Sequence, residues 1–213
     1  MDFVPLVQVG KEHYDFENYC KKDSWLNFWY QIKTVLSYQP QRVLEIGPGT
    51  GVVTDILKKN GIEVVTLDID ESLSPDVVAS VHDIPFSAKS FDLVLCCEVL
   101  EHLPYKFFIK SLKEIYRVTR GSAVLGLPNA SGVLLVNIKI PLLHKLVFFR
   151  KIPFFWKTHR FNGEHYWETG KKGHSLDRTK KDIESVGFSV KKMKIPYDDA
   201  AHVLFVLERG GVL

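Results

Sequence analysis

Apolar residues recur with two different periods along the chain, and their alternation predicts an α/β fold. Short apolar or β-branched runs at 42–46, 63–67, 77–81, 90–96 and 122–127 predict buried strands. Helical patterns at 51–60 and 105–119 lie between these runs. The stretch 14–38 predicts an amphipathic helix, because its large apolar residues stand three and four apart: Trp25, Phe28, Trp29, Ile32, Val35 and Leu36.

The C-terminal part predicts one helix and two strands. Ser175 is a suitable N-cap and Gly187 a suitable C-terminal stop for a helix over 175–187. Strands at 188–195 and 202–208 follow, and the short joint 196–199 predicts an antiparallel hairpin. The expected fold is a doubly wound α/β sheet with an antiparallel C-terminal hairpin. In such sheets the loops after the first strands meet at one edge, where ligands bind.

Residues 129–168 form a long aromatic and basic segment with no assigned element. One hypothesis is a lid over a hydrophobic or anionic ligand, and a second is a basic amphipathic face that touches a membrane surface. A third is a helical insertion packed on the sheet. We expect a single domain over 1–213, with an N-terminal helical segment at 1–40 and this lid insertion at about 129–168.

Composition narrows the class of protein. The 213 residues are 46% hydrophobic, which suits one domain, and a net charge of +3 argues against a nucleic-acid-binding module. Cys20, Cys96 and Cys97 fit no metal spacing and no disulfide framework, so we predict no metal site and reduced thiols in a cytoplasmic protein. Residues 1–8 lack the pattern of a signal peptide, and charged residues and prolines interrupt the apolar stretch 133–156, so no spanning helix is expected.

A glycine-rich loop follows the first predicted strand, in the sequence Glu45-Ile-Gly47-Pro48-Gly49-Thr-Gly51. Glycines there let a ligand approach the backbone. A dinucleotide site prefers the spacing G-x-G-x-x-G, whereas this loop has G-x-G-x-G. The Glu45 carboxylate would repel a pyrophosphate but suits a ligand that carries an ammonium and a sulfonium. The pattern therefore favours S-adenosyl-L-methionine.

Acidic residues follow the second and third predicted strands. Asp68 ends the second strand, where a carboxylate can accept both hydroxyls of a ribose, while Asp70 is expected to cap the next turn. Asp83 can accept a hydrogen bond from an adenine amine, and Ile84 with Ile69 can enclose the adenine ring.

The segments 43–51, 68–69, 83–86 and 91–104 together resemble class I S-adenosylmethionine-dependent methyltransferases, of the type 11-like group with a "VLEH" sequence after the fourth strand. The resemblance covers about 41–129. It implies a Rossmann-like, seven-stranded α/β/α sandwich that converts S-adenosyl-L-methionine to S-adenosyl-L-homocysteine. By the same resemblance, the glycine loop surrounds the methionine moiety of the cofactor, and Cys97 and Glu98 face its sulfur.

Residues for catalysis and acceptor binding are less defined. His102, with Glu98 or Glu101 one turn away, is a candidate general base, or it packs the start of the next helix. His165, Tyr166 and Trp167 are candidates for the acceptor pocket. No Asn/Asp-Pro-Pro-Tyr/Phe motif follows the fourth strand, which argues against methylation of a DNA base amine.

We expect methyl transfer to a small-molecule or lipid-like acceptor. The alternatives are a non-catalytic S-adenosylmethionine-binding protein, a nicotinamide-dependent oxidoreductase, and an RNA or protein methyltransferase. The motifs carry no information on the oligomeric state.

Overall fold

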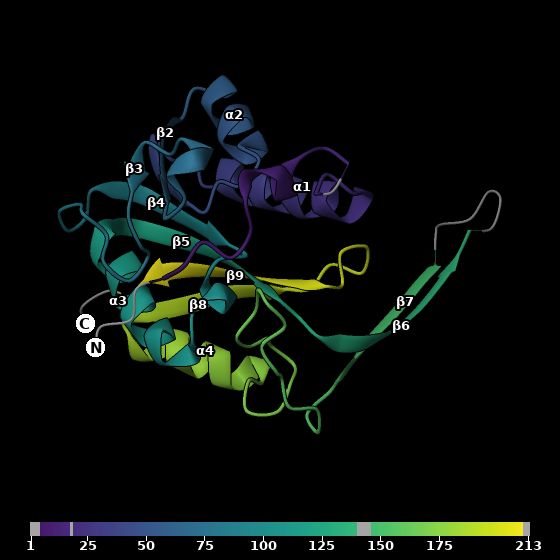
Figure 1. Cartoon of the computed structure of the whole chain (residues 1–213). Helices are drawn as coiled ribbons and strands as arrows, with labels where there is room; N and C mark the ends of the chain where they lie inside the picture. Colours follow the sequence, from purple (N-terminus) through teal and green to yellow (C-terminus); the bar gives the residue numbers. More distant parts are fainter. Residues whose placement is uncertain (1–4, 18, 140–145, 211–213) are drawn as a thin grey trace.

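The computed structural model describes residues 5–17, 19–139 and 146–210. Its main element is a sheet of seven strands in the order β3-β2-β1-β4-β5-β9-β8 (Figure 1). The strands are β1 Arg42–Ile46, β2 Glu63–Asp68, β3 Val77–Val78, β4 Phe91–Cys97, β5 Thr119–Pro128, β8 Phe188–Lys194 and β9 His202–Arg209.

The sheet is parallel from β3 to β5 and antiparallel at its other end. Strands β1, β2, β3, β4 and β5 pair in parallel, and β9 is antiparallel to both β5 and β8. The predicted C-terminal hairpin is therefore confirmed. Since β1 and β4 are neighbours at the centre, the crossovers diverge at their carboxyl ends, which is where ligands bind in open α/β sheets.

Helices cover both faces of the sheet (Figure 1). The helices α1 Lys22–Ser37 and α2 Val52–Lys59 lie on one face, and α3 Phe108–Val118 and α4 Leu176–Ser185 lie on the other. Two apolar clusters fill the layers between helices and sheet. The structure thus confirms the expected α/β/α sandwich.

The predicted termini of α4 are also confirmed. The Ser175 hydroxyl accepts a hydrogen bond from the Arg178 amide at 3.1 Å, and Gly187 follows the C-cap with a φ of +107°. The first helix differs from its prediction because it begins at Lys22. The described residues of 15–21 form turns in place of the expected helix, and a separate 3-10 helix, η1 Lys11–Tyr14, precedes them.

The segment 129–168 contains no helix among its described residues, so the helical-insertion hypothesis is wrong. It forms a two-stranded antiparallel ribbon, β6 Ser131–Ile138 and β7 Leu146–Pro153, that projects from the body of the molecule (Figure 1). β-branched and aromatic residues dominate both strands and favour extended structure. Across the described residues, no helix is long and apolar enough to span a membrane.

Candidate active site

Two adjoining cavities open at the carboxyl ends of β1, β2 and β4. The first has a volume of about 130 Å³ and the second about 250 Å³. Gly47, Gly49, Cys97, Glu98 and His102 line both, so the cavities meet between the glycine loop and the end of β4. This junction is where a ligand that spans both cavities would lie closest to the sheet.

The glycine loop can approach a ligand because two of its residues have no side chain. Gly47 and Gly49 have φ values of +72° and +51°. A Cβ atom on Gly47 would stand 2.3 Å from the Val99 side chain, and one on Gly49 would stand 3.2 Å from the Tyr14 ring. Gly51 also has a positive φ, of +75°, but caps α2 and lies outside the residues that line either cavity.

Glu45 lies at the base of the second cavity and is 3% exposed. Its carboxyl group accepts a hydrogen bond of 2.5 Å from the Thr54 hydroxyl. Burial raises the pKa of Glu45 to about 7, although the Thr54 hydrogen bond opposes that rise. A cationic group of a ligand beside this carboxyl would favour its ionised form.

Two aspartates face the first cavity from the end of β2. Asp68 accepts a hydrogen bond from the Asp70 amide at 2.9 Å, and burial raises the pKa of its carboxyl group. Asp70 lines the same cavity and also caps the 3-10 helix η2 Glu71–Leu73, where it accepts from the Ser72 amide at 2.9 Å. Ile69 lies between them on the cavity wall. The pair thus places two carboxyl groups on the wall of the first cavity.

Asp83 and Ile84 lie away from both cavities, unlike the sequence-based expectation. Asp83 is exposed, and Ile84 is buried in the core, with its amide bonded to the Glu114 carboxylate. Strand β3 ends at Val78, three residues earlier than predicted, so Ser80 and Val81 reach the first cavity instead. The residues of this turn that line the first cavity are therefore Ser80 and Val81, and not Asp83 and Ile84.

The end of β4 carries a partly buried ion-pair network. Glu98 has a φ of +53°, and burial raises its pKa. His202 lies 3.7 Å from Glu98 and bonds to Asp199 at 2.5 Å. Burial by itself would lower the pKa of His202, because it disfavours the imidazolium form. The negative charges of Glu98 and Asp199 have the larger effect and raise the His202 pKa to about 9. Its ring is therefore protonated at neutral pH.

His102 lies at the junction of the two cavities, on the 3-10 helix η3 Leu100–His102. Burial lowers its pKa to about 4, and the neighbouring His165 ring contributes. A neutral ring with so low a pKa is a weak general base at pH 7. Glu101 is its nearest carboxylate, with an oxygen 4.0 Å from His102 Nε2.

The segment 164–168 is attached to η3 and to the residue that follows it by two hydrogen bonds. The Tyr166 amide donates to the Glu101 carbonyl at 2.8 Å, and Trp167 Nε1 donates to the Leu103 carbonyl at 3.1 Å. His165 lines the second cavity. Tyr166 stacks near Phe161 at the surface and Trp167 is buried in the core, so neither lines either cavity.

Several lining residues had no signal in the sequence. Residues 5–9, Tyr14 and Tyr19 cover the cavities from the N-terminal segment. Asn27 and Gln31, hydrogen-bonded to each other at 3.0 Å, line the second cavity from α1. The apolar spacing that predicted α1 identified only the apolar face of this helix. Polar residues three or four positions apart usually lie on the solvent-facing side of a helix, so Asn27 and Gln31 gave no indication of a cavity.

Comparison with known proteins identifies the class. Residues 44–126 match the family described as "Methyltransferase domain". A ubiquinone biosynthesis O-methyltransferase of Hahella chejuensis is 32% identical over 81 residues, which cover 30% of this chain and 33% of that protein. An uncharacterized methyltransferase of Staphylococcus carnosus is 30% identical over 116 residues, 48% of this chain and 56% of that protein. The chain spans about a third to just over half of the length of such curated relatives.

Solved structures share the fold over most of the chain. A Burkholderia thailandensis 1,6-didemethyltoxoflavin-N1-methyltransferase superposes with a TM-score of 0.62 at 13% identity, over 94% of this chain and 87% of that one. A Synechocystis magnesium protoporphyrin IX methyltransferase, solved with bound S-adenosylmethionine, gives 0.61 at 12% identity over 88% and 80%. Residues 44–126 therefore resemble a methyltransferase domain, and most of the chain shares the fold of solved S-adenosylmethionine-dependent methyltransferases. The resemblance predicted from its motifs is confirmed, as is the fold.

Proposed function

We propose that the protein transfers a methyl group from S-adenosyl-L-methionine to a small-molecule or lipid-like acceptor. The observation that carries this proposal is the junction of two cavities at Gly47, Gly49 and Glu98, with carboxyl groups placed in each cavity. Glycines replace the Cβ atoms that would fill the junction. A cofactor with a nucleoside at one end and an amino acid at the other fits this division.

The chain's residues divide between the two ends of the cofactor. Asp68 would accept hydrogen bonds from the ribose in the first cavity, with Ser80 and Val81 beside the nucleobase. Glu45 would face the ammonium group of the methionine moiety in the second cavity. The bound cofactor supplies an already activated methyl group, so the protein contributes mainly orientation and exclusion of water. Tyr14 and residues 5–9 provide that cover.

Calorimetric titration with S-adenosyl-L-homocysteine tests the cofactor assignment. We expect Asp68→Ala to weaken binding by about 10- to 100-fold, because charge-assisted hydrogen bonds contribute about 1.5–3 kcal/mol each. Ser72→Ala, beside the same turn, removes an exposed hydroxyl outside both cavities and serves as the control. Unchanged affinity in Asp68→Ala, or stabilisation by NAD in place of S-adenosyl-L-homocysteine, would contradict the assignment. Methyl transfer from labelled cofactor to an extract of small molecules and lipids then separates an enzyme from a non-catalytic binding protein.

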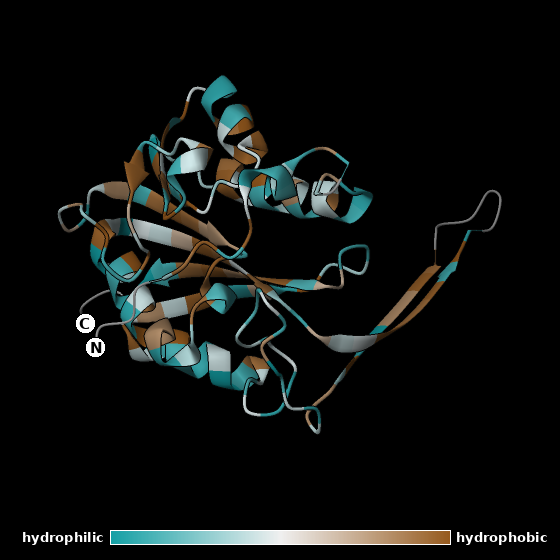
Figure 2. Ribbon diagram, viewed as in Figure 1, coloured by the Kyte–Doolittle hydropathy of each residue, from teal (hydrophilic) through white to brown (hydrophobic). Residues whose placement is uncertain are grey.

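The projecting ribbon favours an acceptor at a membrane surface. Its two strands cover no other element, and Figure 2 shows apolar residues along most of it. Directly opposed residues share a face, so one face combines Leu134, Val136, Ile138, Leu146, Phe148 and Arg150. The apolar members of this face are each 44–59% exposed. An apolar surface of this kind marks an interaction site.

The charge of the ribbon indicates an anionic partner. No Asp or Glu occurs in the sequence between Glu114 and Glu164, whereas the described ribbon and its flank carry Lys139, Arg150, Lys157 and Arg160. Lys151 is directed to the body of the molecule, where its ammonium group donates to the Ala200 carbonyl at 2.5 Å. Two copies of this ribbon placed face to face would bring cations together without acidic partners, which disfavours self-association. Apolar residues among cations suit an anionic lipid surface. Cys96 and Cys97 are buried free thiols, a state that a reducing compartment preserves, so we propose the cytoplasmic leaflet.

Vesicle sedimentation tests the ribbon. We expect the protein to co-sediment with vesicles of phosphatidylcholine and phosphatidylglycerol, and less with phosphatidylcholine alone. The double variant Leu134→Ser/Phe148→Ser should lose at least 10-fold in partitioning, because each buried apolar side chain contributes about 1.5–3 kcal/mol. Trp29→Ser, an equally exposed aromatic residue on α1, should partition as the unmodified protein does. Equal partitioning of the double variant, or a ribbon-dependent dimer in its place, would contradict the proposal.

A further inference from the structure

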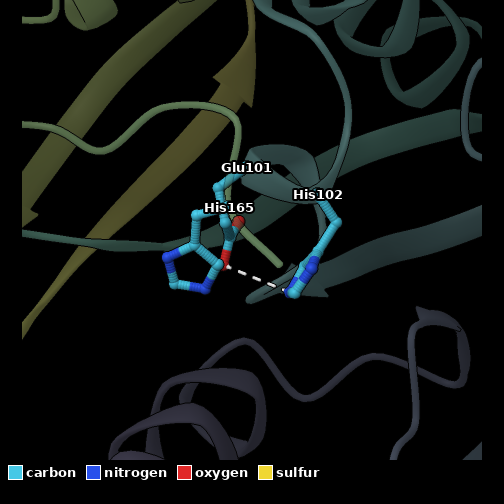
Figure 3. Close-up of side chains that lie close together, drawn as sticks. All are labelled: Glu101, His102 and His165. Carbon is cyan, nitrogen blue, oxygen red and sulfur yellow. Dashed lines mark ion pairs between the residues drawn. The ribbon is translucent and has the colours of Figure 1, made fainter. Parts of the chain in front are cut away.

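Three potential metal ligands converge beside the second cavity (Figure 3). Glu101 and His102 belong to η3, and His165 comes from the segment after the ribbon. One ligand atom from each residue lies within 4.8 Å of the other two. The Tyr166 and Trp167 hydrogen bonds to η3 and to the residue that follows it hold His165 in this position. The cluster is therefore part of the folded framework.

Glu101 is the member with an unmet electrostatic requirement. Its side chain is 0% exposed, and neither carboxyl oxygen has a hydrogen-bond partner among the described residues. Figure 3 shows the carboxyl group directed between the two imidazole rings. A buried carboxylate without a partner is strongly disfavoured, and the Glu98 carboxyl group beside it adds like charge. The site thus calls for a bound cation or for a proton on this carboxyl group.

The two histidines are oriented so that each presents an unshared electron pair. His102 Nδ1 bonds to Gln8 Oε1 at 2.7 Å, while the same amide donates through Nε2 to the His102 carbonyl at 3.1 Å. This second bond sets the orientation of the Gln8 amide, so His102 Nδ1 must be the donor. His165 Nδ1 likewise faces the Glu168 carboxylate at 3.2 Å. A neutral imidazole with a proton on Nδ1 leaves Nε2 as a ligand atom.

That pattern is typical of metal-binding histidines, whose second nitrogen donates to a carboxylate or carbonyl oxygen that sets the tautomer. We propose that Glu101, His102 Nε2 and His165 Nε2 bind a divalent transition-metal cation such as Zn²⁺. Two imidazoles and one carboxylate suit such a cation better than Mg²⁺ or Ca²⁺, which prefer oxygen ligands. This proposal replaces the expectation of no metal, which considered cysteine spacing.

The three ligand atoms lie within 4.8 Å of one another, which is wider than in a bound site, so metal binding would draw them together. Zn²⁺ bonds of about 2.0–2.2 Å place tetrahedral ligand atoms about 3.4 Å apart. His102 Nε2 and the nearer Glu101 oxygen are 4.0 Å apart, so binding draws them together by less than about 1 Å. His102 and His165 both line the second cavity, which leaves room for a further ligand. An oxygen of the methyl acceptor in that position would be held beside the cofactor, and this role alone rests on the proposed function.

Calorimetric titration of chelator-treated protein with Zn²⁺ tests the site, and Co²⁺ absorption reports its geometry. We expect one Zn²⁺ per chain, with affinity lowered at least 10- to 100-fold in Glu101→Gln and in His165→Ala. His165 is partly exposed, so its variant remains informative if the buried Glu101→Gln fails to fold. His174→Ala, whose ring lies outside the cluster, should bind Zn²⁺ as the unmodified protein does.

Two outcomes would overturn the proposal. One is the absence of stoichiometric Zn²⁺ binding, in which case a proton compensates the Glu101 carboxyl group beside Glu98. The other is equal Zn²⁺ affinity in the unmodified protein and His165→Ala. Titration of the same samples with S-adenosyl-L-homocysteine keeps the proposals separate, because Glu101 lines neither cavity and its variant should retain cofactor binding.

Discussion

Gly49→Val is expected to abolish binding of S-adenosyl-L-homocysteine, with a loss of at least 100-fold. Gly49 lines both cavities, and a Cβ atom there would already stand 3.2 Å from the Tyr14 ring. The two methyl groups of valine would extend from that atom into the space shared by the glycine loop and Tyr14. The φ of +51° adds backbone strain for a β-branched residue. Calorimetric titration measures the loss directly.

Gly61→Val is the matched control for this substitution. Gly61 has a φ of +82°, so valine there carries a comparable backbone penalty, but no atom lies within 4 Å of its Cβ position. We expect Gly61→Val to lower the free energy of unfolding by about 1–2 kcal/mol and to retain cofactor affinity. Equal loss of binding in both variants would show that backbone destabilisation, and not the close approach of the ligand to Gly49, causes the effect. If Gly49→Val binds normally, the loop has another purpose.

The sequence predicted the parts of the site that depend on local geometry. A strand followed at once by the G-x-G-x-G loop has few alternative conformations, and the acidic residue at the end of β2 stands next to it in the sheet. Asp68 and Gly49 were therefore identified from their positions along single elements. The parallel pairing of β1 with β2 and β4 then brings those positions to one edge.

Residues that reach the site through tertiary packing could not be predicted in this way. Tyr14 contacts the Gly49 position from the N-terminal segment, and His202 reaches Glu98 from the last strand. Neither contact follows from spacing, because each depends on how distant segments cross the sheet edge. That Ser80, and not Asp83, lines the first cavity has a more local cause. Strand β3 is short, and where a two-residue strand ends is poorly specified by its own pattern.

The ribbon shows a different limit. Its apolar runs are equally compatible with a buried helix and with a strand when only periodicity is considered. Their β-branched and aromatic content favours strands, but the runs lack the burial that normally accompanies apolar strands. Residues whose apolar pattern is typical of a protein core therefore form an exposed surface here. The sequence could not show this, because exposure depends on what the rest of the chain leaves uncovered.

Trp167→Ala is expected to lower the free energy of unfolding by about 3–5 kcal/mol, the usual cost of deleting a buried aromatic side chain. Trp167 is 1% exposed and packs edge-on against Tyr105 and Phe108, with ring centroids 4.8 Å and 5.1 Å away. Its indole nitrogen also satisfies the Leu103 carbonyl. Since domains of this size are typically stable by about 5–15 kcal/mol, the loss is a large share of the total. Urea denaturation followed by circular dichroism measures it.

Trp167→Phe separates the two contributions of this side chain. Phenylalanine retains most of the apolar contact but leaves the Leu103 carbonyl without its donor, so we expect an intermediate loss of about 1–3 kcal/mol. Both substitutions loosen the segment that holds His165 beside Glu101, so Zn²⁺ affinity should fall with stability while cofactor affinity changes less. A loss below about 1 kcal/mol for Trp167→Ala would show that the segment 164–168 does not depend on this anchor, and the rigidity assigned to the metal cluster would have to come from elsewhere.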